Sequence, residues 1–111
     1  MTGQEWTLDY YRDEKGRAPF CEWFDSLSDF KAQAVINARL ARVRLGNFGS
    51  CQSLGQGMLE LKMDYGPGYR IYFGKISGKV VLLLCGGDKS TQQKDILTAH
   101  CYWRRFKEKQ K

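Results

Sequence analysis

Residues 58–85 read MLELKMDYGPGYRIYFGKISGKVVLLLC, and we infer the fold class from this stretch. In its first part, Met58 to Asp64, apolar and polar residues alternate from Leu59 onward, which is typical of a half-buried β-strand. Residues 69–76 are expected to form a second strand. Residues 79–85 are nearly all apolar, which predicts a central strand covered on both faces. The short glycine-containing connections predict an antiparallel meander.

Four further elements flank the meander: a strand at residues 5–11, a short helix at 19–27, a longer helix at 29–45 and a final helix at 90–106. Pro19 suits the first turn of a helix, Ser28 can cap the longer helix, and Gly46 suits the left-handed position that ends it. The longer helix carries three arginines that we expect to be solvated: Arg39, Arg42 and Arg44. The order β-α-α-β-β-β-α predicts one α+β domain over residues 1–111, a small antiparallel-rich twisted sheet with helices packed on one face.

The charge is distributed unevenly along the 111 residues. Residues 1–30 hold three basic and seven acidic residues, whereas residues 31–111 hold fifteen basic and five acidic ones. This basic part suggests a polyanionic partner, most often a nucleic acid, although a basic surface without a particular partner has the same composition.

No apolar run approaches the roughly 20 residues that span a bilayer. The first ten residues lack the features of a signal peptide, so we expect a cytoplasmic protein.

The cysteines and the single histidine exclude several kinds of chemistry. The four cysteines are Cys21, Cys51, Cys85 and Cys101. None belongs to a CxxC pair, so we expect free thiols and no zinc site. His100 lies in a helical pattern with apolar neighbours, which favours packing over catalysis. An enzymatic site would therefore use Lys, Arg, Asp, Glu or Tyr.

Polar residues of the meander are expected to share one open face of the sheet. A two-residue turn at Ser77-Gly78 would place Tyr72 opposite Leu83, and Arg70 opposite Cys85. The residues expected on this open face are Glu60, Lys62, Asp64, Arg70 and Tyr72, above an apolar floor of Val81 and Leu83. Lys89 would enter from the rim.

The start of the final helix is a candidate anion site. Free backbone N–H groups of residues 90–92 and the helix dipole would favour a phosphate, with Lys89 and Arg70 adding positive charge. The sequence GGDKST lacks the spacing of a Walker loop. Tyr65 or Tyr72 could stack on an unpaired base. Each basic residue also has a structural interpretation: Arg70 as a partner of Glu60 or Asp64, Lys62 as a solvated strand residue, and Lys89 as the end of a turn.

Two segments, ELKMDYGPGYRIYF at residues 60–73 and LLCGGDKSTQQKDI at residues 83–96, resemble a known family. The pattern is similar to the HigB-like "addiction module killer protein" branch of the RelE/ParE toxin superfamily, from about Ala18 to Ala99. The resemblance implies a RelE-like fold and the toxin of a type II toxin–antitoxin module. Such toxins commonly cut mRNA on the ribosome, without metal or cofactor, by attack of a ribose 2′-OH on the adjacent phosphate.

The resemblance implies roles for three basic residues. Arg70 matches the arginine that stabilises the phosphate, Lys62 is a candidate base or charge stabiliser, and Lys89 is a candidate acid or stabiliser. Candidate substrate-binding residues are Asp64, Tyr65, Tyr72, Ser90, Gln92 and Lys94. The best-known ribonuclease of the superfamily also has a C-terminal tyrosine in its site. The corresponding helix carries Asp95-Ile96 here, so that role is either absent or moved to Tyr65, Tyr72 or Asp95.

The resemblance also implies partners. We expect a cognate helix-turn-helix antitoxin, mRNA on the ribosome, and operator DNA reached only through the antitoxin. Two alternatives to a nuclease remain open: a toxin that inhibits a protein target in the manner of ParE, and an inactive toxin that retains antitoxin binding.

Overall fold

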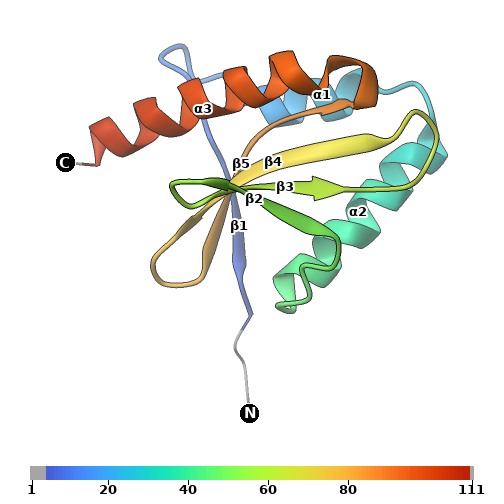
Figure 1. The fold of residues 1–111 in the computed structure, drawn as a ribbon, viewed down its shortest axis with the longest axis horizontal. Coiled ribbons are helices and arrows are strands. Elements are labelled where there is room, and N and C mark those ends of the chain that lie inside the picture. The colour runs from blue at the N-terminus through green and yellow to red at the C-terminus, as the bar shows by residue number, and fades with distance from the viewer. Residues whose placement is uncertain (1–4, 111) are drawn as a thin grey trace.

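The computed structural model describes residues 5–110 and contains a five-stranded sheet (Figure 1). The elements are β1 (Thr7–Tyr10), α1 (Pro19–Ser26), α2 (Phe30–Arg44), β2 (Cys51–Gly55), β3 (Met58–Lys62), β4 (Tyr69–Ile76), β5 (Val80–Asp88), the 3₁₀ turn η1 (Lys89–Thr91) and α3 (Gln92–Lys109). The strand order is β1-β5-β4-β3-β2. β1 runs parallel to β5, and the other neighbouring strands are antiparallel. The predicted α+β class is confirmed.

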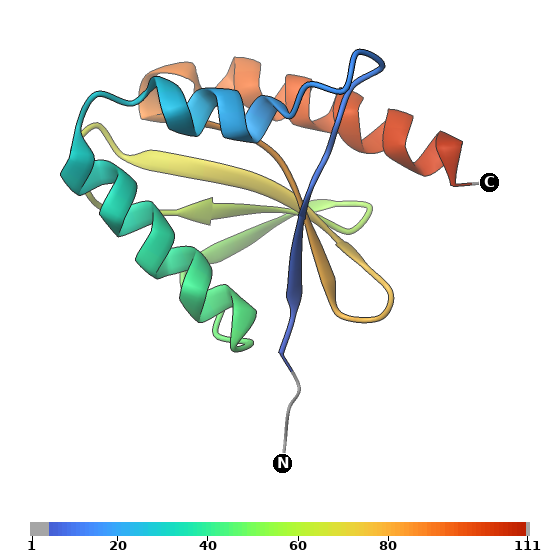
Figure 2. The same ribbon diagram turned by 180° about the vertical axis from the view of Figure 1, so that it is seen from behind.

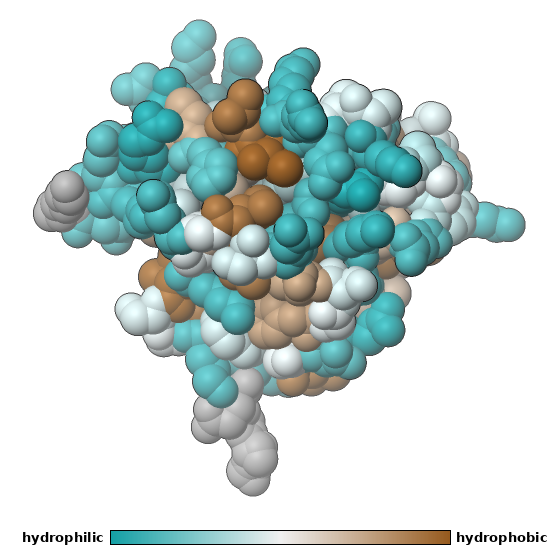
Figure 3. Space-filling model, in the orientation of Figure 1, coloured by the Kyte–Doolittle hydropathy of each residue, from teal (hydrophilic) through white to brown (hydrophobic). Residues whose placement is uncertain are grey.

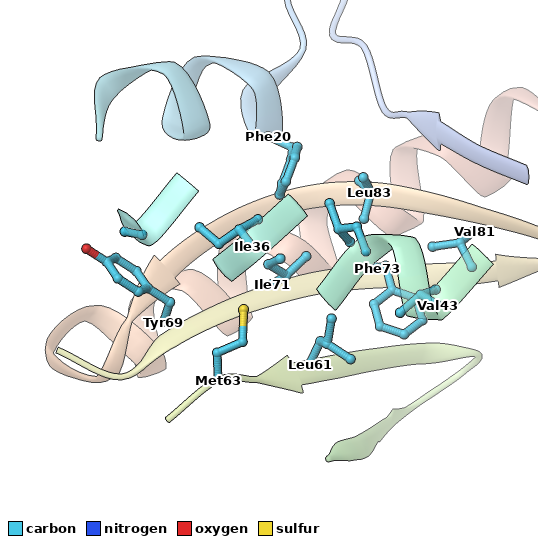
Figure 4. Packing of buried hydrophobic residues seen from close by; sticks show 12 residues of the cluster. Phe20, Ile36, Val43, Leu61, Met63, Tyr69, Ile71, Phe73, Val81 and Leu83 are labelled. Carbon is cyan, nitrogen blue, oxygen red and sulfur yellow. The ribbon is translucent and has the colours of Figure 1, made fainter. Parts of the chain in front are cut away.

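Helices cover both faces of the sheet, so the prediction of helices on one face is wrong. α1 and α2 pack on one face, where Figure 4 shows Phe20, Ile36 and Val43 against side chains of β3, β4 and β5. α3 packs on the other face, against a second cluster that includes Tyr72 and Leu84. Figures 1 and 2 show α2 and α3 on opposite sides of the strands. The physical reason is that β4 and β5 carry apolar residues on both faces, and both sets must be buried.

β2 is a strand that the sequence analysis missed. It is short and largely exposed, and it lies at the edge of the sheet beside β3. Its residues CQSLG have no clear alternation, which explains why the pattern did not indicate a strand. The turn from β2 to β3 uses backbone angles with positive φ at Gly55, Gln56 and Gly57.

The β4–β5 hairpin has a different register from the predicted one. Ile76 pairs with Val80, so the turn contains three residues rather than two, and Lys79 adopts a φ of 61°. A bulge between Tyr72 and Phe73 then shifts the pairing by one residue. Tyr72 consequently lies opposite Cys85. Leu83, the predicted partner of Tyr72, and Val81, the other expected floor residue, instead belong to the cluster under α1 and α2.

α2 buries a stripe that includes one of its arginines. Asp29, rather than Ser28, caps the helix by accepting a hydrogen bond from the Lys31 amide, and Gly46 has the expected left-handed φ of 89°. The buried residues are Ala32, Ile36, Arg39, Leu40 and Val43. The prediction that Arg39 is solvated is therefore wrong. Its guanidinium donates to the carbonyls of Phe48 (2.7 Å) and Ser50 (3.1 Å) and fixes the loop after α2.

Two glycines of the sheet make room for α3 and α1. A Cβ at Gly74 would lie 2.3 Å from the ring of Trp103 in α3, and a Cβ at Gly86 would lie 2.3 Å from the ring of Trp23 in α1. The sequence analysis ended this strand at residue 85, just before Gly86, but β5 continues to Asp88. Gly86 therefore marks close packing rather than a strand end.

Among residues 5–110, no helix combines the length and the apolar character that crossing a bilayer requires. Figure 3 shows that one face of the molecule is mostly hydrophilic, with apolar side chains gathered near α3. Leu97 of α3 is one exposed apolar residue, with 72% of its surface accessible.

Candidate functional site

The three predicted catalytic cations meet at one end of the sheet. Lys62 ends β3 and lies directly opposite Arg70 of β4, so their side chains project from the same face. Lys89 follows β5 and lies beside Gly68. The position of a Cβ at Gly68 is 3.3 Å from Arg70 Nη1 and 3.5 Å from Lys89 Cβ. The fold thus gathers the predicted residues Lys62, Arg70 and Lys89, which we call the cation cluster.

Arg70 is the buried member of the cation cluster, whereas Lys62 and Lys89 are exposed. Only 5% of Arg70 is accessible to solvent. Its Nη1 donates to the carbonyl of Gly68 (2.9 Å), and its Nε lies 3.7 Å from Glu60 Oε2. Nε forms no hydrogen bond with any residue that the structure describes. Of the two structural partners considered from the sequence, Glu60 is the one that Arg70 faces.

Glu60 connects β3 to the start of α3. It is 4% exposed, and its Oε2 accepts a hydrogen bond of 2.9 Å from Gln92 Nε2. The sequence analysis assigned Gln92 to substrate binding and did not foresee this contact. Gln92 binds the protein's own carboxylate instead.

Tyr72 is completely buried beneath α3, so the prediction that it could stack on a base is wrong. Burial and the nearby carboxylate of Glu60 raise the pKa of its hydroxyl, which therefore stays protonated. The hydroxyl has no hydrogen-bond partner within residues 5–110. The expected open face is closed at this point because α3 lies over it, and its expected floor residues Val81 and Leu83 lie on the opposite face.

The predicted anion site at the helix start is occupied by the protein itself. Asp88 Oδ1 accepts hydrogen bonds from the Ser90 amide (2.8 Å) and the Ser90 hydroxyl (2.5 Å). The Gln92 amide donates to the Lys89 carbonyl. An Asp carboxylate thus takes the place that the sequence analysis gave to a phosphate. Lys94 remains exposed in the first turn of α3, next to Lys89 along a shallow hollow.

A second hollow lies between α2 and the end of β3 and brings together Lys62, Asp64 and Tyr65. Its volume is about 320 Å³, and Arg42 and Asn47 also line it. Tyr65 is partly buried and donates a hydrogen bond to Asp29 Oδ2 (3.2 Å). Tyr65, Arg42 and Lys62 thus line the same hollow.

The sequence analysis did not assign Arg39 or Arg42 to the site. Arg39 supports the wall of this second hollow through the carbonyls of Phe48 and Ser50. A signal for its burial existed, since Arg39 lies three residues after Ile36 and four before Val43 on the buried stripe of α2. Arg42 carried no such signal, because its place beside Lys62 depends on tertiary packing.

We expect Cys85 to resist alkylation in the native protein. Burial, followed by the carboxylate of Asp95, raises the pKa of its thiol to about 12, which leaves roughly one thiolate in 10⁴ at about pH 8. Mass spectrometry after iodoacetamide treatment should therefore show Cys85 modified only once the protein is unfolded. Cys101, partly exposed on α3, serves as the internal reference. Fast stoichiometric labelling of native Cys85 would contradict this expectation.

The fold and the cation cluster define a small α+β protein with a basic site at one end of its sheet. A scan against protein-family models finds no match. The chain is 50% identical over 80 residues to an uncharacterized protein of Haemophilus influenzae, a match that covers 72% of this chain and 81% of that protein. The chain belongs to the same family as this Haemophilus protein.

Proposed function

We propose that the protein is the toxin of a type II toxin–antitoxin module and acts as a metal-independent, ribosome-dependent mRNA endonuclease with a RelE-like fold. The observation that carries this proposal is the gathering of Lys62, Arg70 and Lys89 at one end of the sheet. The sequence resemblance to HigB-like toxins supplies the family and the reaction. The five-stranded mixed sheet with three helices is compatible with that fold.

The proposed reaction is an internal transfer at one phosphate of the RNA. The ribose 2′-oxygen forms a bond to phosphorus, the bond to the 5′-oxygen breaks, and the products are a cyclic phosphate and a 5′-hydroxyl. A base takes the 2′ proton and an acid protonates the leaving oxygen. We assign stabilisation of the developing charge to Arg70, whose planar fork matches phosphate oxygens. Lys62 and Lys89 are the candidates for base and acid.

The two hollows beside the cation cluster fit the flanking nucleotides. Tyr65 lies in the one at the end of β3 and could stack on a base there, with Arg42 near the backbone phosphate. Lys94 lines the other hollow with Lys89. We assign Asp64 to hydrogen bonding with a base edge. The proposed partner is a helix-turn-helix antitoxin that covers this basic surface and connects the toxin to operator DNA.

The proposed function can be tested by measuring mRNA cleavage with variants of the two exposed lysines. We expect Lys62→Ala and Lys89→Ala each to slow cutting of mRNA on programmed ribosomes about 10²-fold, because each removes an acid–base or charge-stabilising group. Both residues are exposed, so the fold should survive. Primer extension would locate the cuts. Lys15→Ala, an exposed lysine in the turn before α1, is the charge-matched control and should cut at the wild-type rate.

The burial of Arg70 favours a second candidate function. A guanidinium that is 5% exposed and faces Glu60 can serve the fold alone. The protein would then be a non-nuclease toxin that inhibits a protein target, or an inactive toxin that retains antitoxin binding. Folded wild-type protein that leaves mRNA uncut on translating ribosomes would support this second candidate and refute the nuclease.

A further inference from the structure

Two different parts of the fold lie against the guanidinium of Arg70. Nη1 donates to the Gly68 carbonyl in the β3–β4 connection, and Nε is turned toward Glu60 Oε2 at 3.7 Å. Because the guanidinium is planar and rigid, fixing two of its nitrogens also fixes the direction of the third, Nη2. The orientation of Arg70 therefore depends on where the Glu60 carboxylate lies.

The carboxylate of Glu60 is itself held in place by α3. Gln92 Nε2 donates to Glu60 Oε2, the same oxygen that faces Arg70 Nε. Tyr72 lies opposite Glu60 in the β3–β4 ladder and fills the space beside it. Three elements thus meet at Glu60 Oε2: the first turn of α3, the middle of β3 and the start of β4.

A buried ion pair of this kind is poor evidence for stability, because desolvation of both charges offsets their attraction. The pair here also lacks a hydrogen bond, since Nε has no partner within residues 5–110. Its geometric consequence is more definite: a negative charge beside Nε attracts the edge of the guanidinium that carries the Nε–H and one Nη2–H, and with Nη1 held by Gly68 this limits how the plane of the group can turn.

We propose that Glu60 and Gln92 are positioning residues that orient the Arg70 guanidinium toward a phosphate bound at the cation cluster. This inference rests on the proposed phosphate-binding role of Arg70. Gln92 fixes the Glu60 carboxylate, and Glu60 turns Nε of Arg70 inward. Neither residue contacts the RNA. The start of α3 thereby determines the geometry of an arginine on β4.

Glu60→Gln and Gln92→Ala test the positioning role. Glu60→Gln keeps the side-chain shape and an oxygen for Gln92 but removes the charge that attracts Nε. Gln92→Ala keeps that charge but removes the group that fixes it. We expect kcat for mRNA cleavage to fall about 10- to 100-fold in both variants, with KM for programmed ribosomes unchanged, because a misoriented group loses reactivity rather than affinity. Leu97→Ala, an exposed residue of the same helix that lines neither hollow, is the control and should retain the wild-type kcat.

A spectroscopic readout separates this inference from the proposed function. The Nε–Hε signal of Arg70 in a ¹H–¹⁵N spectrum of the free protein, assigned by its loss in Arg70→Lys, should move and exchange faster in Glu60→Gln and Gln92→Ala but not in Leu97→Ala. An unchanged signal in both folded variants would overturn the positioning role, as would wild-type kcat in both. If the wild-type protein does not cut RNA, the proposed function fails, whereas the Arg70 signal still decides whether Glu60 and Gln92 orient the guanidinium.

Discussion

Arg70→Ala is expected to slow mRNA cleavage on the ribosome roughly 10²–10³-fold, the usual consequence of losing one group that stabilises the transition state. The proposed reaction concentrates negative charge on the phosphate oxygens. Arg70 is the arginine of the cation cluster, with Nη1 bound to the Gly68 carbonyl and Nε 3.7 Å from Glu60 Oε2, so Nη2 is the nitrogen that we assign to a phosphate oxygen. Single-turnover cleavage, followed by primer extension, would measure the loss directly.

The burial of Arg70 makes a second variant necessary. Removing the guanidinium leaves the Glu60 carboxylate buried without its counter-ion, which typically costs about 3–5 kcal/mol. Arg70→Lys keeps a positive charge near Glu60 but lacks the bidentate fork, so we expect a folded protein that cuts at least about tenfold more slowly. Circular dichroism and urea unfolding would establish the folded state of both variants. A folded Arg70→Ala or Arg70→Lys protein that cuts at the wild-type rate would remove Arg70 from the mechanism.

The meander could be predicted from the sequence because its signals are local. The residues of β4 were predicted without error, and the alternation of β3 placed Lys62 and Arg70 on the same face, as the register shows. The same alternation was also used to predict an open polar face of the sheet, and this prediction is wrong. The apolar run of β5 already required cover on both sides, so α3 was needed over Tyr72.

The register of the β4–β5 hairpin depends on features without a clear sequence signal. The three-residue turn moved Val81 and Leu83 to the face under α2, and the bulge at Tyr72 then placed Cys85 opposite Tyr72. A one-residue change of register moves a side chain to the other face of a sheet, so an error in turn length reassigns every residue between the turn and the bulge.

The structure agrees with the predicted site where the prediction used strand register. It differs from the prediction where the site depends on how α3 packs on the sheet. Lys62, Arg70 and Lys89 meet because neighbouring strands and their connections bring them together. The contact of Gln92 with Glu60 connects residues 32 positions apart and follows from the way α3 lies on the sheet. No local pattern encodes such a contact.

Trp103→Ala is expected to lower the free energy of unfolding by about 3–5 kcal/mol, since it removes a large buried side chain and leaves a cavity. Trp103 is 4% exposed, and its ring lies against Gly74 of β4. Its Nε1 donates to the carbonyl of Gln56 in the β2–β3 turn (2.7 Å). The variant also leaves that carbonyl without its partner. Urea unfolding monitored by circular dichroism would give the difference in free energy.

Leu97→Ala is the matched control for this loss, because Leu97 is a large apolar residue on the same helix but is 72% exposed. Its replacement should change the free energy of unfolding by less than about 0.5 kcal/mol. A Trp103→Ala protein as stable as Leu97→Ala would mean that α3 is not anchored to the sheet by its indole. Anchoring also bears on the site, because the helix that carries Trp103 begins with Gln92. If α3 docks as one unit, Trp103→Ala should therefore loosen the hydrogen bond from Gln92 to Glu60 and, through it, the orientation of Arg70.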